Sequence, residues 1–172
     1  AVTGGTLVYS LTGKEGPYTP GIPQQTEPGE YTVWYKVQGD KNHNDTEPQS
    51  VVGTIRPISI GSVTAESLSK AYDGSAEIDP QQLVLQFYDE IYNSITLPES
   101  AYTITRAYFT DDRGTESSDV GRKGIMYIIK FLDDHYAPSR PIDDDGREGR
   151  YGVAASSMGT SFSITPASAP TA

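Results

Sequence analysis

The sequence predicts an all-β protein organised as two tandem modules. Val, Ile and Thr together make up 40 of the 172 residues, against seven Leu, and the chain also holds 12 Tyr, 17 Gly and 12 Pro. β-branched and aromatic residues favour strands, and Gly and Pro favour the turns between them. Segments that alternate apolar and polar residues recur between clusters of Gly, Pro, Asn and Asp, which indicates half-buried antiparallel strands.

The clearest strand covers residues 31–37. Its odd-numbered positions, Tyr31, Val33, Tyr35 and Val37, lie on one face, and Thr32, Trp34 and Lys36 lie on the other. It follows Pro28-Gly29 and runs into the polar stretch 39–45, which suits a loop. Further strands are expected at 5–11 and 50–55.

An internal repeat defines the modules. The segment 124–131 aligns with 30–37, so that Lys130 falls on Lys36 and Phe131 on Val37. Each copy then enters an acidic loop with one histidine, His43 or His135, and closes on an Ile-x-Pro sequence at 55–57 or 164–166. The second copy is longer because of a polar insertion around 141–152.

We therefore divide the chain into a first module at 1–57, a second at 58–166 and a Pro/Ala/Ser linker tail at 167–172. About 57 residues are marginal for a disulfide-free β-domain. We expect the sequence to begin inside the first module, without that module's opening strand, and to be a piece of a longer chain.

In the second module, strands are expected at 62–65, 83–88, 94–97, 102–109, 124–132 and 161–164. One stretch is ambiguous. Asp79-Pro80-Gln81-Gln82 has the features of a helix start, and Leu83, Phe87, Ile91 and Ile95 recur with helical spacing. Leu83, Leu85 and Phe87 also alternate as in a strand. We favour the strand and keep the helix as an alternative.

Charge and composition exclude several classes of function. The net charge is −10, and no Lys/Arg-rich stretch reverses it locally, which disfavours binding to nucleic acid. No apolar run approaches the roughly 20 residues that span a bilayer, so no membrane insertion is expected in this segment. The absence of Cys removes disulfides, thiolate metal sites and thiol nucleophiles.

Two motifs resemble a known family. The segment 29–45, a Gly-x-Tyr-Thr-Val-x-Tyr-Lys-Val strand running into Gly-Asp-x-Asn-His, resembles repeats in large surface proteins of Gram-positive gut bacteria. Ser69-Lys70-Ala71-Tyr72-Asp73-Gly74-Ser75 is similar to the signature of YDG/MBG-type repeats, as is the closing segment 162–167. The middle of the second module, about 80–120, matches loosely, and 133–152 is atypical.

This resemblance implies two immunoglobulin-like β-sandwich modules on a secreted, cell-wall-attached protein. It implies a stalk or adhesion segment whose partners are the adjacent repeats, and it transfers no catalytic residue. Asp73-Gly74 also suits a tight turn, because Asp supplies an acceptor and Gly tolerates positive φ.

Two groups of residues are candidate metal ligands. Asp143, Asp144 and Asp145 offer hard oxygen ligands for calcium, although a helical calcium loop centred on Gly146 would put Pro141 at its first position. The alternative is a solvated acidic loop balanced by nearby arginines, Arg140, Arg147 and Arg150. The two histidines lie beside carboxylates, but each loop supplies one nitrogen ligand, so we expect local turns there.

Two aromatic residues are candidate sugar-binding positions. Trp34 lies on the strand face opposite Tyr31 and Val33, and Tyr92 lies in a polar stretch, so either ring can stack on a sugar. The other strand aromatics are expected in the core. No hydrolase motif is present, and no enzyme activity or cofactor is expected. Lys36 and Lys130 also suggest the lysine–asparagine cross-links of pilin-like sandwiches, a minor alternative.

The sequence thus predicts non-catalytic stalk repeats of a bacterial cell-wall-attached surface protein. The alternative is a binding module that recognises a host glycan or matrix protein through loops of its second module.

Overall fold

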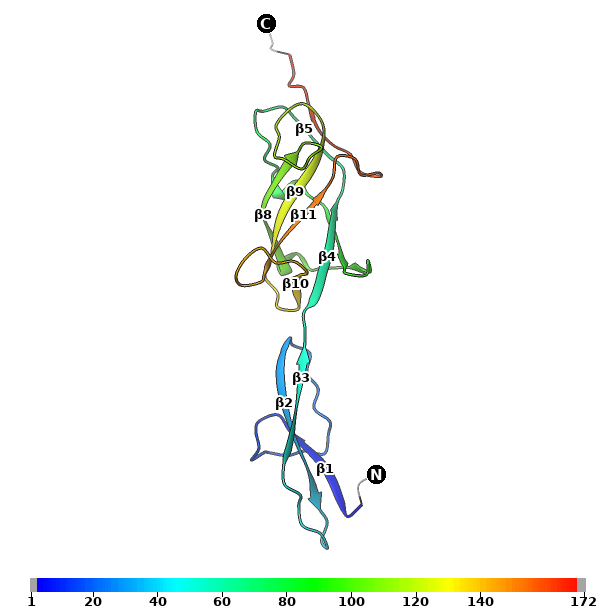
Figure 1. Cartoon of the computed structure of the whole chain (residues 1–172), viewed down its shortest axis with the longest axis vertical. Coiled ribbons are helices and arrows are strands. Elements are labelled where there is room, and N and C mark those ends of the chain that lie inside the picture. Colours follow the sequence, from blue (N-terminus) through cyan, green and yellow to red (C-terminus); the bar gives the residue numbers. More distant parts are fainter. Residues whose placement is uncertain (1–2, 170–172) are drawn as a thin grey trace. The chain divides into compact units, whose positions relative to one another are not determined.

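The computed structural model describes residues 3–169 and confirms the all-β class (Figure 1). Its helical pieces within that range are two 3₁₀ turns, Pro80–Gln82 and Glu99–Ala101. The chain divides into two compact units, Ala1–Pro57 (unit 1) and Ile58–Ala172 (unit 2). The division falls where the first Ile-x-Pro sequence ends.

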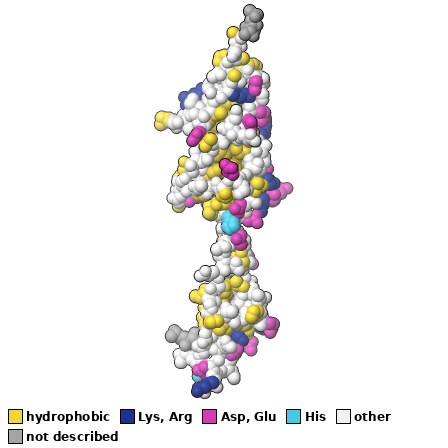
Figure 2. All heavy atoms as spheres, turned by 180° about the vertical axis from the view of Figure 1, so that it is seen from behind, with side chains coloured by type: hydrophobic (Ala, Val, Ile, Leu, Met, Phe, Trp, Pro, Cys, Tyr) yellow, Lys and Arg dark blue, Asp and Glu magenta, His cyan; other side chains and the backbone are white. Residues whose placement is uncertain are grey.

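Unit 1 is a three-stranded antiparallel sheet in the order β1-β2-β3, formed by Gly5–Ser10, Gly29–Gly39 and Gln49–Ile55. Leu7 pairs with Val37, and Val33 pairs with Val51. The described strands form one sheet, with no second sheet packed on it among residues 3–57. Its core is small, because only Val8 and Ser10 are fully buried there. Figure 2 shows hydrophobic side chains gathered on the visible face of this unit.

Unit 2 has a first sheet in the order β10-β4-β6-β7. Its strands are β4 (Ile58–Ala65), β6 (Leu85–Asp89), β7 (Ser94–Ile95) and β10 (Tyr136–Pro138). β4 pairs antiparallel with β6 and parallel with β10, and its register with β6 shifts between Ile60 and Ser62. This irregularity lies at Gly61, where a Cβ would meet the carbonyl oxygen of Asp89 at 2.8 Å.

The other sheet of unit 2 is built around β9 (Gly121–Phe131). β9 pairs antiparallel with β8 (Tyr102–Thr110), β11 (Glu148–Val153) and β12 (Phe162–Thr165). β12 also pairs in parallel with β5 (Leu68–Ala71). β11 and β12 pair with successive segments of β9: β11 pairs with residues 125–130 and β12 with residues 121–123. In unit 1, the edge of β2 opposite β1 pairs with one strand, β3, over residues 29–35.

The core of unit 2 lies between these sheets. Alternate residues of β9, Ile125, Tyr127, Ile129 and Phe131, are 0–1% exposed, and they pack with residues of β4, β6, β8 and β12. Two tyrosines carry hydrogen bonds across the core: the hydroxyl of Tyr127 donates to the carbonyl of Val63 at 2.6 Å, and that of Tyr151 to the carbonyl of Ile60 at 3.1 Å. Burial raises the pKa of both tyrosines.

The repeat seen in the sequence also appears in the contacts. Lys36, on β2, pairs with Asp45 at 2.7 Å, and Lys130, on β9, pairs with Asp145 at 3.5 Å. In each unit, therefore, the lysine near the end of the long strand binds a carboxylate of a later loop, which in unit 2 lies between β10 and β11. The same lysines face β1 and β8 at equivalent positions, opposite Val8 and Thr103.

One sequence expectation needs correction. The insertion at 141–152 was expected to be a polar loop, but it includes most of β11, an integral strand, because Glu148 to Val153 pair in full register with β9. Gly149 and Gly152 weaken the alternation of apolar and polar residues by which a strand is recognised in the sequence. In the ambiguous stretch at 80–95 the favoured strand is confirmed: a single 3₁₀ turn, capped by Asp79, is followed by strands β6 and β7.

We predict that unit 1 unfolds before unit 2, because its buried core is far smaller. Trp34 is the single tryptophan and lies in unit 1, so its fluorescence reports on this unit alone. On heating, the fluorescence midpoint should precede the far-ultraviolet circular dichroism midpoint of the remaining structure. Coincident transitions by both probes would contradict this prediction.

We also predict that Tyr127→Phe lowers the free energy of unfolding of unit 2 by about 1–2 kcal/mol, because it removes the buried hydrogen bond to the Val63 carbonyl. Urea denaturation followed by circular dichroism measures this. Tyr72→Phe is the matched control, since Tyr72 is 45% exposed, and its stability should equal that of the wild type.

The wild type and Tyr127→Phe also test how the stability of unit 2 depends on pH. A tyrosine whose pKa is raised by folding stabilises the native state below its unfolded pKa, about 10, and this stabilisation is lost as pH rises above that value. The wild type should therefore lose stability faster than Tyr127→Phe above about pH 10. Parallel losses would show that Tyr127 does not contribute.

Candidate functional site

Unit 2 has a surface groove of about 470 Å³, which we call the Tyr92 groove. Four segments meet there: β4, the turn between β6 and β7, the segment after β10, and β11. Its lining is mainly polar and consists of Gly61, Ser62, Asp89, Glu90, Tyr92, Ser139, Arg140, Arg150 and Tyr151.

Asp89 shapes the turn that forms one wall of the groove. Its Oδ1 accepts from the backbone N–H of Ile91 at 2.9 Å and of Asn93 at 2.8 Å, and its Oδ2 accepts from the side-chain amide of Asn93 at 2.8 Å. Burial raises the pKa of Asp89, but the hydrogen bonds from Asn93 and Ile91 outweigh it, so the pKa ends below its usual value. An ionised Asp89 therefore fixes the turn, and its oxygens are already occupied.

Tyr92 adopts a backbone conformation that is unusual for its residue type. Its φ is 64°, and it is the one non-glycine residue with positive φ among those described. Its side chain is 79% exposed, so burial does not compensate for the strain. A bulky side chain held in this region typically costs about 1–3 kcal/mol, and such outliers concentrate at functional sites.

Two arginines also line the groove. Arg150 belongs to β11, and Arg140 follows β10, next to Ser139, whose backbone N–H donates to the carbonyl of Ile60 at 3.0 Å. Both side chains are exposed, and within residues 3–169 neither makes a hydrogen bond or an ion pair.

From the sequence, these two arginines were expected to balance the negative charge of the acidic loop. In the structure, other cationic side chains pair with its carboxylates. Arg147 pairs with Asp134, and Lys130 pairs with Asp145. Arg140 and Arg150 are thus the groove residues that sequence reasoning missed. No spacing in the sequence marks them, because strand pairing brings them to the groove.

The predicted sugar-binding residues lie in different units. Tyr92 lines the groove in unit 2. Trp34 lies on β2 of unit 1, opposite Ser10 and Ser50, and is half-buried. Its ring is therefore less available as a stacking surface than that of Tyr92.

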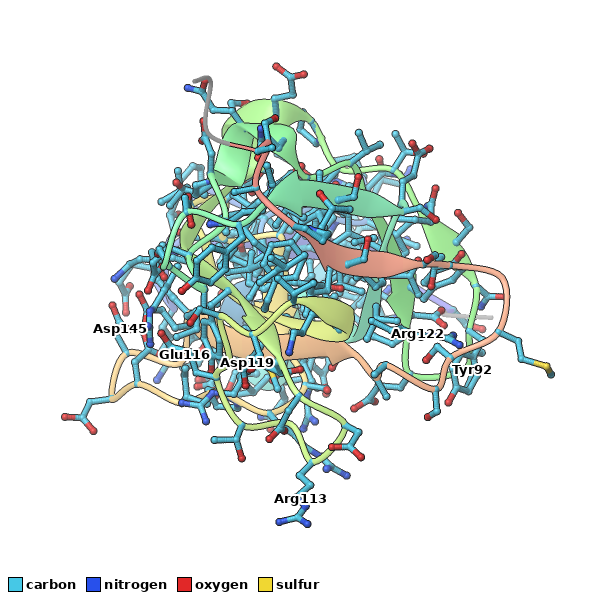
Figure 3. All side chains as sticks on the ribbon, turned by 90° about the horizontal axis from the view of Figure 1, so that it is seen from above. Tyr92, Arg113, Glu116, Asp119, Arg122 and Asp145 are labelled. Atoms are coloured by element: carbon cyan, nitrogen blue, oxygen red, sulfur yellow. The ribbon has the colours of Figure 1, made fainter. Side chains whose placement is uncertain are left out.

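The acidic loop uses its carboxylates locally. Oδ1 of Asp143 accepts from the backbone N–H of Arg147 at 3.0 Å and of Glu148 at 2.8 Å. In the described part of the chain, no three His, Cys, Asp or Glu side chains are grouped to hold a metal ion. The structure gives the predicted calcium site at Asp143, Asp144 and Asp145 no support. Tyr92 and Asp145 lie on opposite sides in Figure 3.

The two histidines are each bound by a carboxylate of their own loop. Nδ1 of His43 lies 2.7 Å from Oδ1 of Asp40, and Nδ1 of His135 lies 2.7 Å from Oδ1 of Asp133. The hydrogen bond with His43 is the main cause that lowers the pKa of Asp40. These pairs hold local turns, as the sequence indicated.

Comparison with protein-family models, with curated proteins and with solved structures found no match. No helix formed by residues 3–169 is long and apolar enough to cross a membrane. The arguments about function therefore depend on the geometry of the chain itself.

We predict that Tyr92→Gly stabilises unit 2 by about 1 kcal/mol, because glycine adopts positive φ without a steric cost. The measurement is the midpoint of urea unfolding followed by circular dichroism. Tyr72→Gly is the control: it removes an equally large ring next to strand β5, where the backbone needs no positive φ, and should be neutral or destabilising. An equal change in both variants would show that Tyr92 is not strained.

Proposed function

We propose that this chain is a non-catalytic stalk segment of an extracellular, cell-wall-attached surface protein of a Gram-positive gut bacterium, joined to adjacent repeats of that protein. The observation that supports it best is the parallel pairing of β5 with β12. These strands lie near the beginning and at the end of unit 2, so tension along the chain acts on this pair.

The pairing geometry determines how such tension is borne. Phe162 faces Leu68 and Thr165 faces Ala71, and the pair is extended at both ends by backbone hydrogen bonds, from Leu68 to Ser161 at 3.1 Å and from Tyr72 to Thr165 at 2.8 Å. Both strands run in the same direction, so pulling on the two chain ends slides them past each other. All the hydrogen bonds then share the load, whereas peeling would break them one at a time.

The entry into unit 2 is held in a similar way. The backbone N–H of Ile58 donates to the carbonyl of His135 at 2.7 Å, and β4 continues in parallel with β10. In Figure 1 the chain enters unit 2 at one end of β4 and leaves, after β12, at the opposite end. Tension therefore runs along the strands.

The groove supports a non-catalytic role. Glycoside cleavage generally needs two available carboxyl groups. Of the two acidic residues that line the Tyr92 groove, Asp89 is occupied by the turn that it holds, which leaves Glu90 alone.

We predict that unit 2 resists force when it is pulled from its two ends and yields easily when β5 is peeled from β12. Because the chain has no cysteine, introduced cysteines can attach force handles at chosen positions. In the full chain, Arg56→Cys with Ala167→Cys loads the pair in shear, and Tyr72→Cys with Ala167→Cys peels it from one end. The unfolding force, measured by single-molecule force spectroscopy, should be several-fold higher in the first geometry.

Equal thermal midpoints of the two double variants serve as the control, because they show that only the direction of pulling differs. Equal unfolding forces in both geometries would contradict the load-bearing role of the pair.

A further inference from the structure

The two groove arginines stand out against the charge of the protein. The chain carries a net charge of −10, and Arg106 and Arg147 are both engaged in ion pairs with carboxylates. Arg140 and Arg150 have no such partner in the described structure, yet they line one groove. Guanidinium groups bind carboxylates through paired, charge-assisted hydrogen bonds, so the groove offers a site for an anionic group.

The rest of the lining limits which anion fits. Glu90 and Asp89 place negative charge in the same groove, so an extended polyanion would be repelled there. Within residues 3–169 the hydroxyls of Ser62 and Ser139 have no hydrogen-bond partner, and with the carboxylate of Glu90 they can bind hydroxyl groups. The lining therefore matches a small ligand that carries one negative charge and several hydroxyls.

The ring of Tyr92 adds a flat surface to this polar lining. It is 79% exposed and is carried by a backbone conformation that a smaller residue would adopt more easily. The turn that presents it is fixed by three hydrogen bonds to Asp89, so the ring is held at the groove on a preformed support. Aromatic rings with one exposed face bind the apolar faces of flat ligands.

We propose that the Tyr92 groove binds an acidic sugar, a saccharide residue that carries a carboxylate. Arg140 and Arg150 bind the carboxylate, the ring of Tyr92 stacks on the sugar, and Ser62, Ser139 and Glu90 bind its hydroxyls. A volume of about 470 Å³ lies within the roughly 300–1,000 Å³ of small-ligand sites and holds one or two sugar rings. This site is independent of the proposed stalk function, since it does not involve β5 or β12.

The test is a titration of the full chain by isothermal calorimetry and by ligand-observed NMR. The probe is 3′-sialyllactose, a second acidic probe is a glucuronic acid disaccharide, and lactose is the neutral counterpart. A short Asp/Glu-rich peptide tests whether any carboxylate suffices. We expect saturable millimolar or tighter binding of at least one acidic saccharide, with lactose and the peptide at least about tenfold weaker.

Three variants locate the site. Arg140→Gln and Arg150→Gln should each weaken binding about tenfold, because each removes a charge-assisted hydrogen-bonding group. Arg113→Gln is the matched control: it removes the same charge from a residue that shares a second hollow with Arg150 but does not line the Tyr92 groove, and Figure 3 shows Arg113 well apart from Tyr92. Tyr92→Phe should retain binding and Tyr92→Gly should lose it, although the glycine variant remains folded.

Several results would overturn the proposal. They are the absence of saturable binding by either acidic saccharide at millimolar concentration, equal binding of lactose or of the acidic peptide, and an equal effect of Arg113→Gln and the groove variants. Retained affinity in Tyr92→Gly would remove the stacking role and, with it, the assignment of the site to a sugar.

Discussion

Unit 2 depends on one strand, β9. Four of its side chains, at alternate positions from Ile125 to Phe131, are almost completely buried, and its backbone pairs with β8, β11 and β12. A slip of one residue would turn this apolar set to the outside, so its register is strongly determined. The hydroxyl of Tyr127 adds a second constraint, because it must reach the Val63 carbonyl of the opposite sheet. The relative position of the two sheets follows from these contacts.

The walls of the Tyr92 groove are held in place by contacts with the same core. The carbonyl of Ile60 accepts both the hydroxyl of Tyr151 and the backbone N–H of Ser139, so one residue of β4 binds β11 and the segment after β10. The next residue is Gly61, whose missing side chain lets the β6–β7 turn approach. The walls that carry Arg140, Arg150 and Tyr92 are therefore positioned by buried contacts directly beneath them, the arrangement that a preorganised site requires.

Much of this architecture could be predicted from local patterns. Alternation identified the strands around Tyr31 and Ile125, and Asp73-Gly74 forms the expected tight turn, in which Asp73 accepts from the N–H of Ser75 at 2.9 Å and Gly74 has φ of 82°. At Asp79 the capping signal was locally correct, but the following residues gain more by pairing with β4 than by extending a helix. Local propensity was outweighed there by long-range pairing.

The site was harder to predict, because it depends on residues that meet only after strand pairing. β11 has two glycines among its six residues, so its alternation is weak, and its assignment as a loop misplaced Arg150. Tyr92 was found because its surroundings are polar, yet its positive φ has no sequence signal. The charge partners of Arg147 and Lys130 decide which arginines remain available, and these partners are brought into place by the folding of the segment 132–147, which includes β10.

Strand β4 belongs both to the entry of the chain into unit 2 and to the lining of the Tyr92 groove. In the proposed stalk, tension that entered unit 2 at Ile58 would pass along β4 toward Ile60 and Gly61, beside the strand's hydrogen bonds to β6 and β10. A ligand in the Tyr92 groove would contact β4, the β6–β7 turn and β11 together, and so connect strands that are otherwise joined by separate contacts. A ligand that binds only the folded state stabilises it by RT ln(1 + [L]/Kd), which increases with the concentration of free ligand. A module that held an acidic sugar would therefore be more resistant to unfolding at β4, the strand that tension would reach first. Ligand binding and mechanical strength would then reinforce each other.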